Sequence, residues 1–190
     1  MFRKIGVFAF VFCLCFVVKG VFAQDLTLEV VKAKVLAAAK LIEEEGTGAF
    51  SKLKDPNGEF RFGDGKGYVW VHSLNGQMIM HPTRPELERT DMLNDKDSSG
   101  FPFIYAMNQL VEKRKQGWVV YLWPKPGKKI EEIKASFVRL ARNQGKDYVV
   151  GCGMYAASAD YVRSAFPGDA IYDSTNFFGT PQLDSVDEGK

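Results

Sequence analysis

The stretch "YVWVHSLNGQMIMHP", which runs from Tyr68 to Pro82, predicts two antiparallel strands joined by a tight turn. Asn75-Gly76 is among the strongest short hairpin signals, and aromatic, β-branched and other apolar residues stand on both sides of it. Both alternating sets of residues 68–71 are apolar. We therefore expect this hairpin to lie inside a sheet that is covered on both faces.

The register of the hairpin places a histidine beside aromatic residues. If Asn75-Gly76 forms a two-residue loop, Trp70 faces His81 and His72 faces Ile79. Tyr68 then shares a face with Trp70 and His81. The proline that follows His81 has no backbone donor, so the chain should leave the sheet there. His81 is expected at a strand end beneath a departing loop, a natural rim for a pocket.

The rest of the chain predicts helices and further strands around this hairpin. Apolar residues recur every three or four positions over residues 25–45, which predicts a long amphipathic helix that ends before Gly46. Shorter helices are expected at residues 49–54, 101–115 and 157–166, and strands at residues 118–123, 134–140 and 148–154. The strands cluster without regular alternation with helices, which is typical of an antiparallel sheet in an α+β fold.

The first 23 residues have the features of a signal peptide. Arg3 and Lys4 precede an apolar run over residues 5–18, and cleavage is expected after Ala23, with an uncleaved anchor as the alternative. Loss of residues 1–23 removes three basic and no acidic residues, so the formal net charge falls from +2 to −1. This charge gives no support for nucleic-acid binding. We expect the remaining residues to form one domain at residues 24–167 and a polar tail at residues 168–190.

Little in the sequence favours catalysis or a cofactor. Cys152 is the one cysteine after residue 23, and it stands within an apolar strand, where a thiol usually packs and stays unreactive. His72 and His81 have no acidic partners at helical spacing, which makes a poor metal site. We therefore expect neither an enzyme nor a bound metal or cofactor, and an oxidising compartment without an intrachain disulfide.

Several separated motifs together resemble a known family. "YVWVHSLNGQMIMHP" is followed by "GWVVYLWPKP" at residues 117–126, "IKASFV" at 133–138 and "DYVVGCGMYA" at 147–156. In this order they resemble a single Cache domain, the PAS-like extracellular sensor module of bacterial chemoreceptors and histidine kinases, over roughly residues 26–166. The resemblance implies a long N-terminal helix packed on a five-stranded antiparallel sheet. It also implies a small-molecule pocket between the sheet and the segment that joins strands two and three.

The candidate ligand contacts are aromatic, basic or hydroxyl-bearing side chains: Tyr68, Trp70, His81, Arg84, Tyr105, Tyr121, Trp123, Lys134 and Tyr155. An inward Lys134 would be costly without an anion, and a loop arginine such as Arg84 suits a carboxylate. Each has a plainer alternative. His81 would be a structural histidine bonded to backbone, the aromatic residues would be core, and Lys134 would be a solvated residue at a strand start.

Together these features predict an exported sensor that binds a short organic acid such as acetate, pyruvate or lactate. Typical relatives continue into a membrane helix and a signalling domain, whereas such segments are not expected after this domain. We therefore expect this chain to be periplasmic or secreted and to act through a membrane-bound receptor or kinase. A homodimer through the N-terminal helix is a further expectation. Two alternatives stay open: an amine or amino acid held by Asp91 or Asp97, and a dimerising interaction module without a ligand.

Overall fold

The computed structural model describes residues 25–177 and confirms the expected helices and strands. The helices are α1 (Leu28–Glu45), α2 (Ala49–Lys54), α3 (Phe103–Arg114) and α4 (Ala159–Ala165). The strands are β1 (Arg61–Phe62), β2 (Gly67–His72), β3 (Met78–Met80), β4 (Gln116–Pro124), β5 (Glu131–Asn143), β6 (Lys146–Tyr155) and β7 (Ile171–Tyr172). The expected signal peptide, its cleavage site and the end of the polar tail lie outside the described residues. No helix in the described part is both long and apolar enough to cross a bilayer.

The sheet contains the five expected strands and two short additions at its edges. Its strand order is β1-β2-β6-β5-β4-β7, and β3 pairs with β2 beside this path. Neighbouring strands are antiparallel except for β4 and β7, which are parallel. β1 and β7 have two residues each, too few for any periodicity to predict them. The expected polar tail therefore begins inside the fold, since β7 lies within it.

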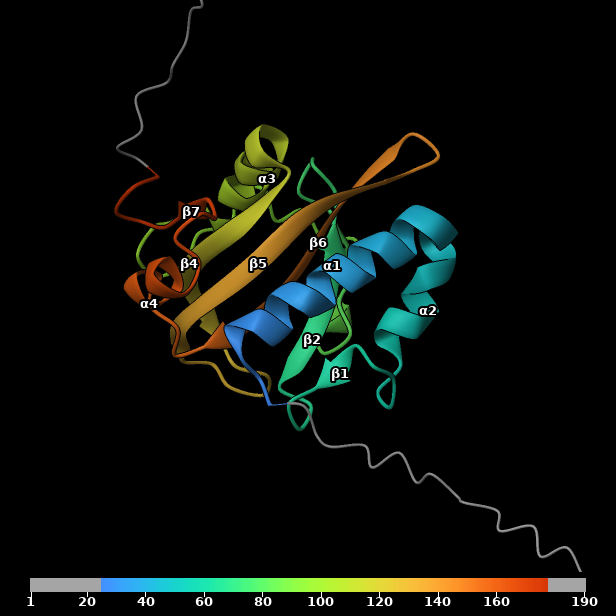
Figure 1. The fold of residues 1–190 in the computed structure, drawn as a ribbon, viewed down its shortest axis with the longest axis horizontal. Helices are drawn as coiled ribbons and strands as arrows, with labels where there is room; N and C mark the ends of the chain where they lie inside the picture. The colour runs from blue at the N-terminus through green and yellow to red at the C-terminus, as the bar shows by residue number, and fades with distance from the viewer. Residues whose placement is uncertain (1–24, 178–190) are drawn as a thin grey trace, which may run out of the picture.

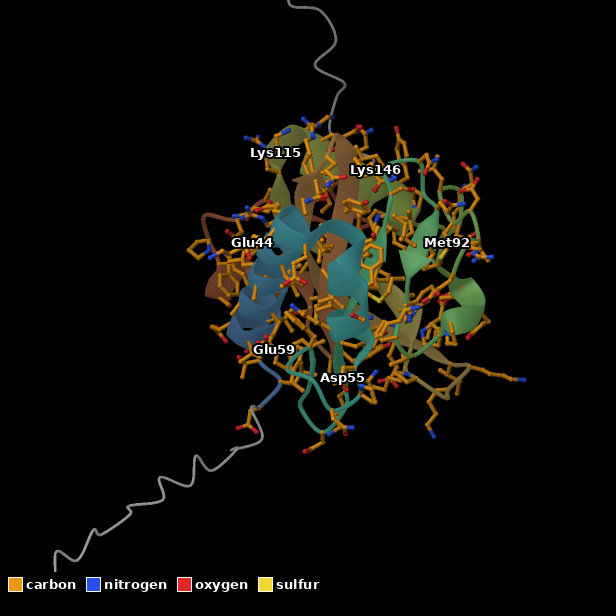
Figure 2. The ribbon with its side chains drawn as sticks, turned by 90° about the vertical axis from the view of Figure 1, so that its right-hand side faces the viewer. Glu44, Asp55, Glu59, Met92, Lys115 and Lys146 are labelled. Carbon is orange, nitrogen blue, oxygen red and sulfur yellow. The ribbon has the colours of Figure 1, made fainter. Side chains whose placement is uncertain are left out.

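Helices cover both faces of the sheet, as the apolar strand at residues 68–71 predicted. α1 and α2 lie on one face and α3 lies on the other (Figure 1). Val69 and Val71 belong to the core beneath α1, whereas Tyr68 and Trp70 belong to the core beneath α3. In the side view, Glu44 of α1 and Met92 lie on opposite sides of the molecule (Figure 2). The site described below lies within the layer between the sheet and α3.

α1 follows from local capping and from its apolar stripe. The Thr27 hydroxyl accepts a hydrogen bond from the backbone N–H of Val30 at 3.3 Å, which satisfies one free donor of the first turn. Six side chains of one face are buried against the sheet: Leu28, Val31, Val35, Ala38, Ala39 and Ile42. The helix ends at Gly46, as expected, where the chain turns with a φ of +59°.

The hairpin loop differs from the two-residue turn that the sequence predicted. The N–H of Gly76 bonds to Ser73 O at 2.9 Å and the N–H of Ser73 bonds to Gln77 O at 3.0 Å, so the loop contains the three residues 74–76. This loop makes His72 face Met78, and the expected pair of His72 with Ile79 is wrong.

Beyond the pair of His72 and Met78, a β-bulge returns β2 and β3 to the register that the sequence predicted. Val71 pairs with Met80, whereas the preceding pair joins His72 to Met78, so Ile79 is the extra residue. The register of Val71 with Met80 is the one that brings Trp70 level with His81. The loop length was wrong by one residue, and the bulge compensates for it.

Candidate functional site

A small cavity lies between the sheet and α3, close to the end of β3. Its volume is about 20 Å³, which is room for about one water molecule. It is lined by Trp70, Met78, His81, Met92, Phe103, Ile104, Tyr121, Trp123 and Lys134. Five of these nine were predicted as ligand contacts from the sequence. They come from β2, β4, β5 and the residue that follows β3, and they meet between the sheet and α3.

Lys134 is the buried cation of this cavity. The residue is 1% exposed. Its Nζ lies 4.9 Å from the ring centres of Tyr68 and Trp70 and 5.1 Å from the ring centre of Tyr155. The ammonium donates a hydrogen bond to the Tyr68 hydroxyl at 3.1 Å. The three rings therefore form a cage that partly replaces the hydration of the charge. The expectation of a solvated lysine at a strand start does not fit this burial.

The polar groups around the Lys134 ammonium are tyrosine hydroxyls rather than a carboxylate. Burial opposes the charged form, but the oxygens of Tyr121, Tyr68 and Tyr155 outweigh this effect and hold the pKa of Lys134 above its usual range. Among residues 25–177, none of the side chains that line the cavity is acidic. An ammonium in this position therefore leaves the cavity electropositive.

His81 presents a neutral imidazole to the same cavity. Its Nδ1 accepts a hydrogen bond from the backbone N–H of Arg84 at 3.1 Å, and since an amide can only donate, the ring proton must be on Nε2. Burial and the positive charges of Lys134 and Arg84 lower the pKa of His81 to about 3. His81 packs against the ring of Tyr68 with centroids 5.2 Å apart. The imidazole is thus fixed as a hydrogen-bond donor through Nε2.

The tyrosines around Lys134 hold defined positions. Tyr121 stacks on Phe103 with ring centroids 4.9 Å apart, and its hydroxyl lies 3.2 Å from Ser136 Oγ. Tyr155 donates a hydrogen bond to Pro124 O at 2.9 Å. Tyr68 and Tyr155 touch Lys134 but do not line the cavity. They support the lysine from behind.

Two glycines of β6 leave space for two residues that line the cavity, Trp70 and Lys134. A Cβ at Gly151 would lie 2.6 Å from Trp70 Cε2, and one at Gly153 would lie 2.9 Å from Lys134 Cε and 2.7 Å from Ala135 O. Trp70 and Lys134 can approach the backbone of β6 this closely because these positions lack side chains.

Arg84 and Tyr105 are placed differently from the other candidates. The Arg84 guanidinium lies 5.1 Å from the ring centre of Trp123 and forms an ion pair with Glu86 at 3.3 Å, so it covers the rim rather than the cavity. Tyr105 is 43% exposed and packs edge-on against Phe177 with centroids 6.0 Å apart. The expectation that Tyr105 points into the cavity is corrected here, because helical periodicity turns it away while Phe103 and Ile104 face inward.

Sequence reasoning missed the apolar half of the cavity. Met78, Met92, Phe103 and Ile104 line it, and each is no more than 3% exposed. Nothing in the sequence separates these residues from ordinary core. Met92 is the least predictable, because it reaches the site from a loop whose return path beside β3 depends on tertiary contacts.

His72 and the two acidic residues that were considered for an amine ligand make structural hydrogen bonds. His72 is fully buried and its Nε2 lies 3.0 Å from Asn108 Oδ1, which ties β2 to α3. Asp97 accepts backbone hydrogen bonds from Ser99, Phe101 and Leu122, so it shapes the loop before α3. Asp91 accepts from the backbone of Leu93 and is exposed.

The single described cysteine has no features of a nucleophile. Cys152 is fully buried, and burial raises the pKa of its thiol to about 12. Within residues 25–177, no group of three or more histidine, cysteine or acidic side chains could hold a metal ion. The chemistry available at the cavity is that of a cation, a neutral donor and apolar walls.

Comparison with known proteins agrees with this arrangement. A family model described as a Cache domain matches residues 30–165. The methyl-accepting chemotaxis protein McpP of Pseudomonas putida is 33% identical over 102 residues, which are 53% of this chain and 18% of that receptor. This chain therefore spans less than a fifth of the receptor's length.

Solved structures resemble the same region. A periplasmic sensor domain of a chemotaxis protein is 34% identical with a TM-score of 0.57, over 66% of this chain and 92% of that domain. A structure described as the basis for carboxylic acid recognition by a Cache chemosensory domain is 32% identical with a TM-score of 0.55, over 68% of this chain and 90% of that one.

Proposed function

Because the chain belongs to the Cache domain family, we propose that its cavity binds a short monocarboxylate and that the chain is the sensing part of a chemotaxis or signal-transduction system. One relative of known structure recognises carboxylic acids and another is the sensor domain of a chemotaxis protein. Acetate, propionate, pyruvate and lactate are the ligands we propose to compare first.

The observation that carries this proposal is the pairing of Lys134 with His81. Both line one cavity, Lys134 as an ammonium and His81 as a neutral Nε2–H donor. A carboxylate has two oxygens, so it can accept from both groups at once in a charge-assisted arrangement. An anion would also offset the cost of keeping the ammonium away from water.

The opposite wall limits the size and chemistry of the ligand. Met78, Met92, Phe103 and Ile104 offer neither a hydrogen-bond donor nor a charge to a second carboxylate or a hydroxyl-rich chain. This favours a monocarboxylate with a short alkyl or acyl end. An amine is disfavoured because Asp91 and Asp97, the two acids considered for it, are outside the cavity lining.

We propose that this is a binding site and not a catalytic one. The cavity contains no activated nucleophile among the described residues, and the Cys152 thiol stays protonated at neutral pH. Turnover of the bound acid, followed by NMR of the acid itself, would contradict this part of the proposal.

We propose that the chain is exported and that it passes its signal to a partner, because its N-terminal sequence and its relatives both favour this. The basic and apolar N-terminal residues are typical of a signal peptide, and a similar domain is periplasmic. We propose a membrane-bound receptor or kinase as the partner that reads the occupied state. Two-hybrid or crosslinking capture would test the partner separately from the ligand.

Thermal unfolding of the full chain across a panel of small ligands tests the proposed ligand class. A ligand that binds only the folded state raises stability by about 2.7 kcal/mol at a hundred times its dissociation constant. We expect sodium acetate, propionate or pyruvate to raise Tm, and ethylammonium chloride and succinate at equal ionic strength to leave it unchanged. If no monocarboxylate raises Tm, or if ethylammonium alone does, the proposed ligand class is wrong.

A further inference from the structure

The segment after β3 forms a flap over the cavity, which we define as residues 81–88. The chain leaves the sheet at His81 and returns beside β3, where the N–H of Arg89 bonds to Met78 O at 2.8 Å and the N–H of Met78 bonds to Thr90 O at 3.0 Å. Both ends of the flap are thus fixed to the sheet. Between them the backbone hydrogen bonds are local, from the N–H of Leu87 to Arg84 O at 3.0 Å and from the N–H of Glu88 to Pro85 O at 3.1 Å.

Glu88 joins the two ends of the flap and links them to α2. Its Oε1 accepts the backbone N–H of His81 at 3.0 Å and lies 2.7 Å from Lys54 Nζ at the end of α2. Burial opposes the negative charge, but the bonds from Lys54 and His81 outweigh it and hold the pKa of Glu88 below its usual range. Glu88 is therefore ionised at neutral pH and accepts from both partners.

The flap also orients two residues that line the cavity, His81 and Trp123. The backbone N–H of Arg84 fixes the His81 ring through Nδ1, and the Arg84 guanidinium lies over Trp123 at 5.1 Å. A rearrangement of the flap that separates Arg84 from His81 would therefore free the imidazole and uncover Trp123 together.

A carboxylic acid cannot reach the cavity while every wall keeps its present position. The volume of about 20 Å³ accommodates about one water molecule, less than the four heavy atoms of acetate. The walls on the sheet and on α3, such as Trp70 and Phe103, belong to the packed core beneath α3. His81 and Met92 line the cavity from loop backbone, and residues 82–88 of the flap are partly or fully exposed, so the flap is the part that can open.

We propose that Glu88 and Lys54 are positioning residues that latch the flap closed over the ligand. This inference rests on the proposed function of the cavity and adds the elements that control access to it. The latch joins the flap to α2, which follows α1 after the short turn at residues 46–48. Opening of the flap is thereby coupled to release of the end of α2.

Hydrogen exchange in the full chain without added ligand tests the latch directly. The amide of Arg84 is the reporter, because its hydrogen bond to His81 is untouched by the substitutions. Loss of a hydrogen bond to a charged group should make this amide exchange about tenfold faster in Glu88→Ala. Lys54→Met removes only a partly exposed ion pair and should give a smaller rise of about threefold.

Matched controls come from a neighbouring ion pair, which joins α2 to the end of α1. Lys52 on α2 pairs with Glu45 without touching the flap, so Lys52→Met and Glu45→Ala should leave the exchange of the Arg84 amide at the wild-type rate. The latch is refuted if Glu88→Ala and Lys54→Met exchange at the same rate as these controls. Using two latch variants keeps the test decisive if one of them fails to fold.

Binding kinetics with sodium acetate provide the second readout. Both the association and the dissociation rate constants should rise in Lys54→Met relative to Lys52→Met, because the latch slows passage in both directions. Equal rate constants in the two variants would overturn the latch. If acetate and the other monocarboxylates do not bind the wild-type chain, the proposed function fails, whereas the exchange of the Arg84 amide still decides on the latch.

Discussion

At the scale of single residues, Lys134 has an unusual environment for a cation. It is 1% exposed, surrounded by three aromatic rings and bonded to one hydroxyl, with no acidic side chain in the described cavity lining. Removal of a buried charge that has no ionic partner is often neutral or stabilising. We propose that the role of this charge is to hold an anionic ligand.

Lys134→Met should separate binding from stability. Methionine keeps most of the apolar volume and removes the charge, so we expect the dissociation constant for a monocarboxylate to rise at least about tenfold, or about 1.4 kcal/mol. The Tm without ligand should stay the same or rise. Calorimetric titration and thermal unfolding measure the two quantities.

Lys128→Met is the matched control, because Lys128 is an exposed residue of the loop between β4 and β5. It should bind as the wild type does. The role of Lys134 is contradicted if both variants keep the wild-type affinity. A loss of Tm in Lys134→Met alone, with affinity unchanged, would make the lysine structural.

Protonation of buried histidines should make the fold sensitive to acid. Burial lowers the pKa of His72 from 6.5 to about 4, so the unfolded chain binds this proton at a higher pH than the folded chain does. The contribution of His72 to stability is therefore complete above about pH 6.5 and is lost as the pH falls toward 4. His72→Gln should flatten the fall in the free energy of unfolding over this range, as measured by urea unfolding at several pH values. An unchanged slope would contradict the burial of a neutral His72.

Residues with polar chemistry were predictable from the sequence, whereas their apolar neighbours were not. Lys134 stands out because a charged residue conflicts with the apolar strand that carries it, and His81 stands out because it lies between an apolar strand and a proline. Met78 and Met92 are apolar residues that the sequence would place in an ordinary core, so no local signal distinguishes a cavity wall from packed core. Tyr105 was misplaced because a hydroxyl on a helix indicates no direction until the helix is packed.

At the scale of elements, the Gly-x-Gly pair of β6 determines how close the cavity walls approach the sheet. At Gly153 an added Cβ would meet the backbone oxygen of Ala135 at 2.7 Å, and backbone cannot move aside as a side-chain end can. Gly153→Ala should therefore reduce the free energy of unfolding by about 1–3 kcal/mol and weaken ligand binding by displacing Lys134.

Gly168→Ala is the matched control for this prediction. A Cβ at Gly168 would meet nothing within 4 Å, so stability and affinity should stay near the wild-type values. Urea unfolding and calorimetric titration of both variants check the comparison. Equal stability of the two alanine variants would show that Gly153 does not create the space for Lys134.

The hairpin shows why elements were predictable and exact registers were not. Alternation and turn residues identified β2 and β3, but the loop has three residues and β3 contains a bulge at Ile79. A bulge depends on packing against neighbouring strands and leaves no mark in a single sequence. β1 and β7 were missed for the related reason that two residues have no periodicity.

At the scale of the whole molecule, the outer face of α1 is the surface on which we expect two chains to pair. Ala33 and Ala37 are exposed on α1, and small side chains allow close approach of a second helix. Ala37→Arg should shift a dimer toward monomer in sedimentation velocity, while Lys40→Arg on the same helix should not. A wild-type chain that stays monomeric at high concentration would contradict this expectation.

The layered architecture was predictable because several levels of the sequence agree on it. The helix stripe of α1, the doubly apolar β2 and the clustered strands all require one sheet covered on both faces, and the resemblance to Cache domains gives the same order of elements. The cavity volume was not predictable. It depends on how the flap at residues 81–88 and the helix α3 close over the sheet.

The most direct test of the account is a crystal structure of the protein grown with saturating sodium pyruvate or acetate. We predict a carboxylate in an enlarged cavity, with its oxygens within hydrogen-bond distance of Lys134 Nζ and His81 Nε2 and its carbon end against Phe103. The account is contradicted if the acid occupies another place, or if the cavity stays closed with Lys134 bonded only to Tyr68.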